Sequence, residues 1–293
     1  MTTKIIYHQI KKGVDCPDGY AAAWVAHKSN PGAEIIGCWY QCTEEDLPVL
    51  ESGDLAIIVD FSFPADILQH WSDAGIDILL LDHHKTAMEH LGDISQFSEH
   101  FRGTIKFDMA ECGATLAWKH FFPDKTVPLF LKYVKDRDLW DKVLPNSDAI
   151  HEVVSRLGRS FDLYDLLEKY DDPLTNMTTL ADLGNVLLAP KRRAIAAIAS
   201  RATPAVFLEF EDIPIILLAG DGSEDRLTSD LCEELYTKRY PDALFVACQT
   251  SDGTWSLRSN KNHPEGGFDV GALAKSKGGG GHRNAAGFKE AIA

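Results

Sequence analysis

Residues 55–84 read LAIIVDFSFPADILQHWSDAGIDILLLDHH and indicate the fold class. Two continuous apolar runs, residues 55–59 and 76–81, flank a segment, residues 64–73, that has the length of a crossover helix. Unbroken apolar runs are typical of parallel strands buried on both faces. Strands that alternate with helices of this length are typical of doubly wound sheets. The sequence therefore predicts an α/β domain with a doubly wound parallel sheet.

Polar residues follow each predicted strand of this domain. Residues 4–7 form a further strand, which His8 follows, while residues 19–27 form a helix after an Asp-Gly turn. Asp60 follows the strand at residues 55–59, and Asp82-His83-His84 end the next one. In open α/β sheets the ligand crevice lies outside the carboxyl ends of the strands. We therefore expect these carboxylates and imidazoles to converge at one place.

The rest of the chain predicts a helical middle and a second, smaller α/β domain. The expected helices cover residues 113–121, 127–138, 163–170 and 180–201. A second series follows, with strands at 213–219, 243–249 and 254–259 and a helix at 227–238. We expect a catalytic domain at residues 1–190, a substrate-binding domain at residues 200–293, and an active-site cleft between them.

Composition excludes several classes of protein. With 44 acidic and 29 basic residues the net charge is −15, so the chain will not coat duplex nucleic acid, which needs a basic face. A hydrophobic content of 45% excludes wholesale disorder. No apolar run approaches the ~18 residues of a membrane helix, and the N-terminus lacks a signal-peptide pattern. We expect a soluble cytoplasmic protein with reduced cysteines and no membrane partner.

Carboxylates and imidazoles clustered at strand ends predict a divalent metal site. These ligands suit manganese, iron or zinc. A single Asp there is more often a helix cap, and a single His more often a hydrogen-bonding group. Asp60, Asp18-Gly19 and the Asp-His-His triplet together favour metal binding. Asp60 could bridge two ions, which at about 3.5–4 Å apart hold the attacking and leaving oxygens of a phosphoryl transfer.

Several motifs along the chain resemble those of one enzyme family. They are Asp82-His83-His84, Asp60 in IIVDFS, Asp136-Arg137-Asp138 in YVKDRDLWDK, and the ending GGGGHRNAAG at residues 278–287. In this order they resemble the DHH phosphoesterase family, with its DHH-associated C-terminal domain. The family includes RecJ-like exonucleases, nanoRNases and cyclic-dinucleotide phosphodiesterases. The resemblance covers nearly the whole chain.

The first motif departs from the family pattern. Family members usually carry a His followed closely by Asp-x-Asp-Gly, whereas residues 7–24 here read YHQIKKGVDCPDGYAAAW. Cys16 stands where the first Asp would lie, and Asp18 is the second. Either Cys16 or Asp15 could supply the missing ligand, and Cys16 could equally be a small packing residue.

The resemblance implies a role for each candidate residue. The metal ligands would be His8, Asp18, Asp60, His83 and Asp136, with Asp138 as the alternative to Asp136. Asp82 would orient the neighbouring imidazoles, and His84 would face the scissile phosphate as an electrophile or proton donor. The substrate-binding residues would be Arg258, Gly279, Gly280, Gly281, His282 and Arg283. The glycines could also form an anion-binding nest of backbone N–H groups.

The implied activity is a metal-dependent phosphodiesterase or exonuclease acting on short oligonucleotides or dinucleotides. The expected cofactor is Mn²⁺, with Mg²⁺, Fe²⁺, Co²⁺ or Zn²⁺ as alternatives and one or two ions per chain. Exopolyphosphatase-like or phosphoadenosine phosphatase activity stays open, as does a non-catalytic nucleotide-binding protein with a degenerate site. The oligomeric state is also open, with a homodimer among the alternatives.

Overall fold

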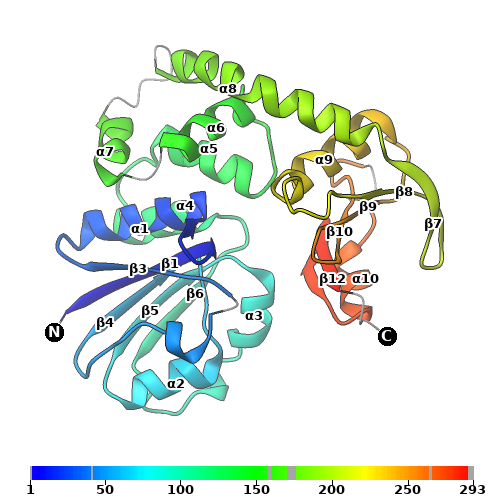
Figure 1. Ribbon diagram of the computed structural model, residues 1–293. Coiled ribbons are helices and arrows are strands. Elements are labelled where there is room, and N and C mark those ends of the chain that lie inside the picture. Colours follow the sequence, from blue (N-terminus) through cyan, green and yellow to red (C-terminus); the bar gives the residue numbers. More distant parts are fainter. Residues whose placement is uncertain (1, 41, 158–159, 170–175, 264–265, 290–293) are drawn as a thin grey trace. The chain divides into compact units, whose positions relative to one another are not determined.

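The computed structural model describes residues 2–40, 42–157, 160–169, 176–263 and 266–289 (Figure 1). The chain divides into two compact units, Met1–Leu188 and Ala189–Ala293. Helix α8 (Asn176–Ala199) runs through the point of division. Each unit has its own sheet and its own core.

The sheet of the first unit has the strand order β3-β1-β4-β5-β6, and all of these pairs are parallel. The strands are β1 (Thr3–Lys11), β3 (Glu34–Cys38), β4 (Leu55–Val59), β5 (Asp77–Asp82) and β6 (Gly103–Phe107), and β2 (Val14–Asp15) pairs antiparallel with β1. Three of these strands were predicted. The outer strands β3 and β6 were not, because an edge strand is partly exposed and lacks an unbroken apolar run.

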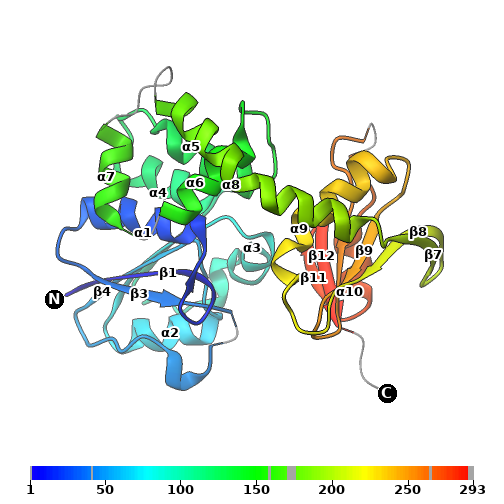
Figure 2. The same ribbon diagram turned by 45° about the horizontal axis from the view of Figure 1, so that its top comes forward.

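Helices cover both faces of this sheet, as Figure 2 shows. Ile57 and Val59 of β4 belong to one core cluster, together with residues of α1 (Pro17–Ser29) and α4 (Gly113–Phe121). Ala56 and Ile58 belong to the opposite cluster, with Leu68 of α2 (Ala65–Asp73). Successive side chains of a strand point to opposite faces, so a strand buried on both sides is apolar at every position. The predicted doubly wound sheet is confirmed.

The remaining helices of the first unit are α3 (Lys85–Leu91), α5 (Leu129–Asp138), α6 (Ser147–Leu157) and α7 (Phe161–Lys169). Short 3₁₀ turns lie at Glu44–Asp46 and Ile94–Gln96. Helices α3 and α6 were not predicted, and residue 170 of the predicted helix at 163–170 lies outside the described residues. Among the described residues, no helix is long and apolar enough to cross a bilayer.

The second unit has a mixed sheet with the strand order β11-β12-β10-β9-β8-β7, in which only the β8–β9 pair is parallel. Its strands are β7 (Thr203–Phe207), β8 (Phe210–Leu217), β9 (Val246–Gln249), β10 (Thr254–Arg258), β11 (Gly280–His282) and β12 (Ala285–Lys289). A 3₁₀ turn at Asp225–Leu227 precedes α9 (Thr228–Glu234), which continues as a π turn at Leu235–Arg239. Helix α9 and α10 (Val270–Ser276) belong to separate core clusters. The predicted second α/β domain is confirmed in its class.

Candidate metal centre

The strand register brings three of the predicted residues into one row. Tyr7 of β1 is level with Val59 of β4, and Val59 is level with Leu81 of β5. The next residues, His8 within β1, Asp60 directly after β4 and Asp82 at the end of β5, therefore lie side by side. The expected convergence at this edge of the sheet is confirmed.

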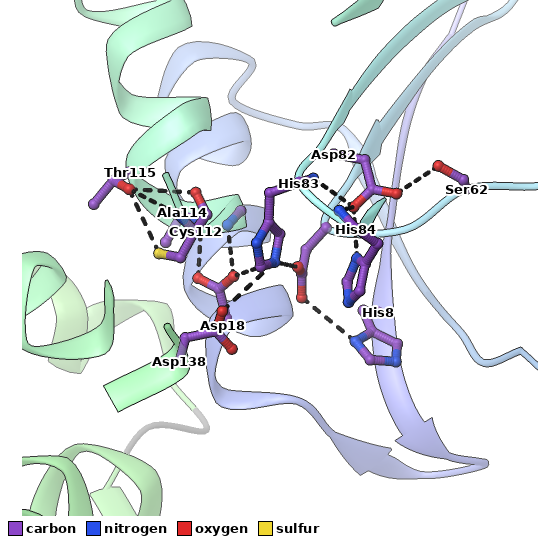
Figure 3. Close-up of polar contacts among 12 residues, drawn as sticks. His8, Asp18, Ser62, Asp82, His83, His84, Cys112, Ala114, Thr115 and Asp138 are labelled. Carbon is purple, nitrogen blue, oxygen red and sulfur yellow. Dashed lines mark hydrogen bonds and ion pairs between the residues drawn. The ribbon is translucent and has the colours of Figure 1, made fainter. Parts of the chain in front are cut away.

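Asp60 is the centre of this cluster. Its side chain is buried, with Oδ1 at 3.0 Å from His83 Nε2 and Oδ2 at 3.4 Å from His8 Nδ1 (Figure 3). Its φ of +56° lies in the left-handed region. Such a conformation costs a non-glycine residue on the order of 1–3 kcal/mol, although Asp tolerates it better than most. It turns the chain at the end of β4 and directs one carboxylate oxygen to each histidine.

Asp18 is held by the first turn of α4. Its Oδ2 accepts a hydrogen bond of 2.6 Å from the backbone N–H of Gly113, and Oδ1 accepts one of 2.9 Å from that of Ala114. A helix N-terminus carries unpaired N–H groups and partial positive charge, so it stabilises a carboxylate. Asp18 Oδ2 also lies 3.6 Å from His83 Nε2. The end of α4 thus orients a carboxylate that comes from α1.

Two glycines allow these elements to approach so closely. A Cβ on Gly113 would lie 2.4 Å from the Cβ of Asp60, and a Cβ on Gly19 would lie 2.5 Å from the carbonyl oxygen of His8. Neither distance is compatible with an alanine unless the backbone moves. Gly113 was not among the predicted site residues, since its contact with Asp60 joins positions far apart in the sequence.

Asp138, and not Asp136, faces the cluster. Asp138 Oδ2 lies 3.5 Å from His83 Nε2. The carboxylate of Asp136 instead accepts backbone N–H groups from Val143 at 2.9 Å and Leu144 at 3.3 Å. Of the predicted residue Asp136 and its alternative Asp138, the structure therefore brings Asp138 to His83. Asp136 orders the chain that follows α5.

Asp82 orients His84 through several hydrogen bonds. Asp82 Oδ1 lies 2.7 Å from His84 Nδ1 and accepts the backbone N–H groups of His83 and His84, while Oδ2 accepts the hydroxyl of Ser62. The ring of His83 is directed by Asp60 rather than by Asp82. The predicted orientation of the neighbouring imidazoles by Asp82 holds for the ring of His84 but not for that of His83, and Ser62 is a contact that the sequence did not indicate.

Cys16, and not Asp15, lies beside the first-motif histidine. One ligand atom each from His8, Cys16 and Asp60 lies within 4.8 Å of the others. The carboxylate of Asp15 accepts hydrogen bonds from the Tyr7 hydroxyl at 2.7 Å and from Gln9 Nε2 at 2.8 Å. Asp15 is therefore oriented by side chains of β1, and Cys16 is the residue that faces Asp60.

The crowding of carboxylates changes their proton affinities. Burial and the charges of Asp60 and Asp138 raise the pKa of Asp18 well above its usual range. Burial would also raise the pKa of Asp60, but the neighbouring His8 and His83 lower it. Burial lowers the pKa of His83, yet its hydrogen bond to Asp60 and the surrounding negative charge raise it to about 10. The cluster thus has an excess of negative charge that a cation would neutralise.

The donor atoms fit a divalent metal ion. Asp60 Oδ2 and His8 Nδ1 are buried and make no hydrogen bond to the described residues, although they lie 3.4 Å apart. Buried polar atoms in this state are rare and require an explanation. A second set, Asp18, His83 and Asp138, also brings its ligand atoms within 4.8 Å of one another. Asp60 directs one oxygen toward each set, which is the geometry of a bridging ligand.

The predicted substrate-binding residues lie in the second unit. Arg258 of β10 and His282 of β11 are both level with Ala285 of β12, so they flank it in one row across the sheet. Cross-strand partners point to the same face. Arg258 is half-buried. It donates hydrogen bonds to the hydroxyl of Ser256 and to the hydroxyl of Ser229, which belongs to α9. This row brings an arginine and a histidine together on one face.

The glycine run forms an edge strand and not the nest of N–H groups that its composition suggested. Gly280 and Gly281 pair with β12, and successive N–H groups of a strand point in opposite directions. Gly279 is required by packing, because a Cβ there would lie 2.1 Å from the carbonyl oxygen of Gly287. Arg283 is exposed and donates to the carbonyl of Gly267.

Comparison with known proteins identifies the fold. No family model matches the sequence. The uncharacterized protein R106 of Acanthamoeba polyphaga mimivirus is 26% identical over 303 aligned positions, which cover 97% of this chain. The structure of RecJ from Thermus thermophilus in complex with Mn²⁺ matches 99% of this chain with a TM-score of 0.54 and 15% identity. The chain has a RecJ-like fold.

The RecJ-like fold extends over nearly all of the chain, and the compared proteins are longer. The chain spans 66% of the length of the viral protein and 49% of the RecJ chain. The pGpG-specific phosphodiesterase PggH from Vibrio cholerae also matches, with a TM-score of 0.48, 14% identity, and coverage of 99% of this chain and 94% of that one. The expectation of this fold, made from the motifs, is confirmed.

Proposed function

We propose that the chain is a metal-dependent phosphodiesterase that hydrolyses short oligonucleotides or dinucleotides. One observation carries the proposal: Asp60 belongs to one set of ligand atoms and contacts His83 of the other, and His84, oriented by Asp82, lies beside them. The RecJ-like fold supports the general class of phosphoesterase, and the Mn²⁺ in the RecJ structure supports manganese as the cofactor.

Some residues of the cluster would bind the ions, and His84 would contact the substrate. Asp18, Asp60, His83 and Asp138 would hold one ion, and His8, Asp60 and a further ligand would hold another. Bound divalent ions activate water and neutralise the charge of the phosphate. Burial lowers the pKa of His84, but its hydrogen bond to Asp82 raises it to about 9, so His84 holds a proton at neutral pH. It offers that proton to an oxygen of the phosphate or of the leaving group.

The second unit would bind the end of the substrate. Arg258 and His282 lie in one row on one face of the sheet, with the small Ala285 between them. A guanidinium can bind phosphate oxygens through two parallel hydrogen bonds. Affinity from a local arginine and histidine agrees with short substrates, since the chain as a whole carries a net charge of −15.

The test is hydrolysis of a 5′-labelled series from dinucleotide to pentanucleotide by the full-length protein with added Mn²⁺. Asp60→Asn should lower the rate of hydrolysis at least about 100-fold. Even the loss of a residue that only hydrogen-bonds a metal ligand lowers metal affinity or activity about 10–100-fold. Asp66→Asn, on the exposed side of α2, is the matched control and should behave as the original protein.

Three results would count against the proposal. Absence of manganese-stimulated turnover on the whole series would exclude it, and binding without turnover would indicate a non-catalytic nucleotide-binding protein. Turnover of polyphosphate or phosphoadenosine alone, assayed in parallel, would replace the substrate class. Near-normal activity of Asp60→Asn would move the chemistry away from this cluster.

A further inference from the structure

The two sets of ligand atoms differ in chemistry. Asp18, His83 and Asp138 offer oxygen and nitrogen ligand atoms, whereas His8, Cys16 and Asp60 also offer a sulfur atom. Thiolate selects softer and borderline ions, while carboxylate-rich sites also suit Mg²⁺ and Mn²⁺. The difference lies within one cluster, on either side of a shared carboxylate.

We propose that His8, Cys16 and Asp60 form a thiolate-containing ion site, and that the centre therefore holds two unlike ions. A borderline ion such as Zn²⁺ would bind beside Cys16, and a harder ion such as Mn²⁺ beside Asp138. This inference rests on the proposed metal centre, and it adds which ion each side prefers. Cys16 binds as the thiolate, and its proton passes to solvent.

The local structure places Cys16 at this point for identifiable reasons. Cys16 directly precedes α1, and its backbone N–H lies 3.4 Å from the carbonyl oxygen of His8. Gly19, in the first turn of the same helix, contacts that carbonyl so closely that no side chain fits. The start of α1 is therefore packed against β1 at His8, and Cys16 and His8 are neighbours as a result.

A second observation, independent of the cysteine, points to a ligand. Asp60 Oδ2 is buried, makes no hydrogen bond to the described residues, and is directed toward His8. The rival carboxylate, that of Asp15, is held by Tyr7 and Gln9. A cysteine that served only to fill space would pack among apolar side chains. Cys16 instead lies with Asp60 and His8, whose facing atoms lie 3.4 Å apart and make no hydrogen bond to the described residues.

The test is a titration of the metal-free, full-length protein with Co²⁺, which binds in place of either ion. A thiolate ligand gives an intense sulfur-to-cobalt charge-transfer absorption in the near ultraviolet, which oxygen and nitrogen ligands do not. The original protein should show this absorption, and Cys16→Ser should lose it. Cys42→Ser is the matched control and should keep it, because Cys42 is not among the clustered ligands.

A second variant tests the preference directly and retains a ligand at the same position. Cys16→Asp should keep two ions per chain, measured by elemental analysis. Competition binding should show that its preference for Zn²⁺ over Mn²⁺ falls at least about tenfold. This is the lower end of the change in metal affinity that follows substitution of a residue next to a metal ligand. Comparing thermal unfolding of each variant with the original protein shows whether the fold is intact.

The outcomes separate this inference from the proposed function. Charge-transfer absorption that persists in Cys16→Ser, or an unchanged zinc preference in Cys16→Asp, would overturn the thiolate site. Cobalt bound by the original protein without such absorption would overturn it too, and would leave the phosphodiesterase proposal standing. If the original protein bound neither cobalt nor manganese, both proposals would fall.

Discussion

Asp82→Asn isolates the charge that Asp82 places beside His84. Asp82 is fully buried, and both of its oxygens accept hydrogen bonds. An asparagine has nearly the same shape. Its amide oxygen can accept from the backbone of His83 and His84, and its NH₂ can donate to the hydroxyl of Ser62, which turns to accept. The substitution therefore removes the negative charge with little loss of hydrogen bonding.

The structure sets the size of the expected effect. The pKa of His84 is raised to about 9 against burial, first by its hydrogen bond to Asp82 and then by the charge of that residue. Without the charge it should fall toward the ordinary value of about 6.5. At about 1.4 kcal/mol for each pH unit, the difference is worth at most about 3.5 kcal/mol. The substitution also removes a buried charge, which favours folding of the variant, so the net loss of stability is smaller than this value.

The sign of the pH dependence follows from the direction of the shift. Because His84 has a higher pKa in the folded state, its contribution is fully present below about pH 6.5 and is lost as the pH rises through about 9. In urea unfolding of metal-free protein, Asp82→Asn should be less stable by up to about 3 kcal/mol at about pH 6. The two proteins should converge near about pH 10.

The direct assay is NMR titration of the histidine rings in metal-free protein. His84 should titrate about two pH units lower in Asp82→Asn, whereas His83 should keep a raised pKa because Asp60 is its main partner. Asp66→Asn is the control for the loss of one carboxylate. The reasoning is refuted if the pKa of His84 is about 9 in both proteins, or if the stability difference does not shrink between the acidic and the alkaline condition.

Three further substitutions test other parts of the structure. Gly113→Ala should weaken Mn²⁺ binding at least about tenfold in calorimetry, because the new Cβ displaces Asp60, and unaltered binding would contradict the close approach. Asp138→Asn should weaken Mn²⁺ binding with little change in stability. Asp136→Ala should lower the free energy of unfolding by about 1–3 kcal/mol and leave Mn²⁺ binding intact. The reverse pattern would indicate Asp136 as the ligand. Arg258→Lys should raise the KM for a dinucleotide and spare kcat, since lysine lacks the bidentate fork, and equal KM values would remove Arg258 from the site.

Residues close to strand ends could be placed from the sequence. Apolar runs locate β4 and β5, and parallel pairing then requires that Asp60 and Asp82 end side by side. The pairing of His84 with Asp82 is local, since the two residues are only two positions apart. These contacts depend on strand direction and short separations, which a hydrophobic pattern encodes.

Contacts between distant elements could not be placed in this way. Asp136 and Asp138 lie two positions apart on α5, so they point about 200° apart around the helix axis, and the motif does not say which side faces the sheet. Asp18 is separated from Gly113 by 95 positions, and their hydrogen bond exists only because α1 packs against α4. The choice between Asp15 and Cys16 likewise depends on the hydrogen bonds of Tyr7 and Gln9.

The arrangement of the cluster argues that it is more than a structural network of ion pairs. Asp60 occupies a left-handed conformation, and the residue beside it, Gly113, has no room for a side chain. Burial and the charges of Asp60 and Asp138 both raise the pKa of Asp18. Each feature is unfavourable for folding, and together they leave a buried carboxylate oxygen without a hydrogen bond to the described residues. Unfavourable features of this kind concentrate where function requires them. A cation between Asp60 and its neighbours would offset the charge repulsion and the unmet hydrogen bond at once.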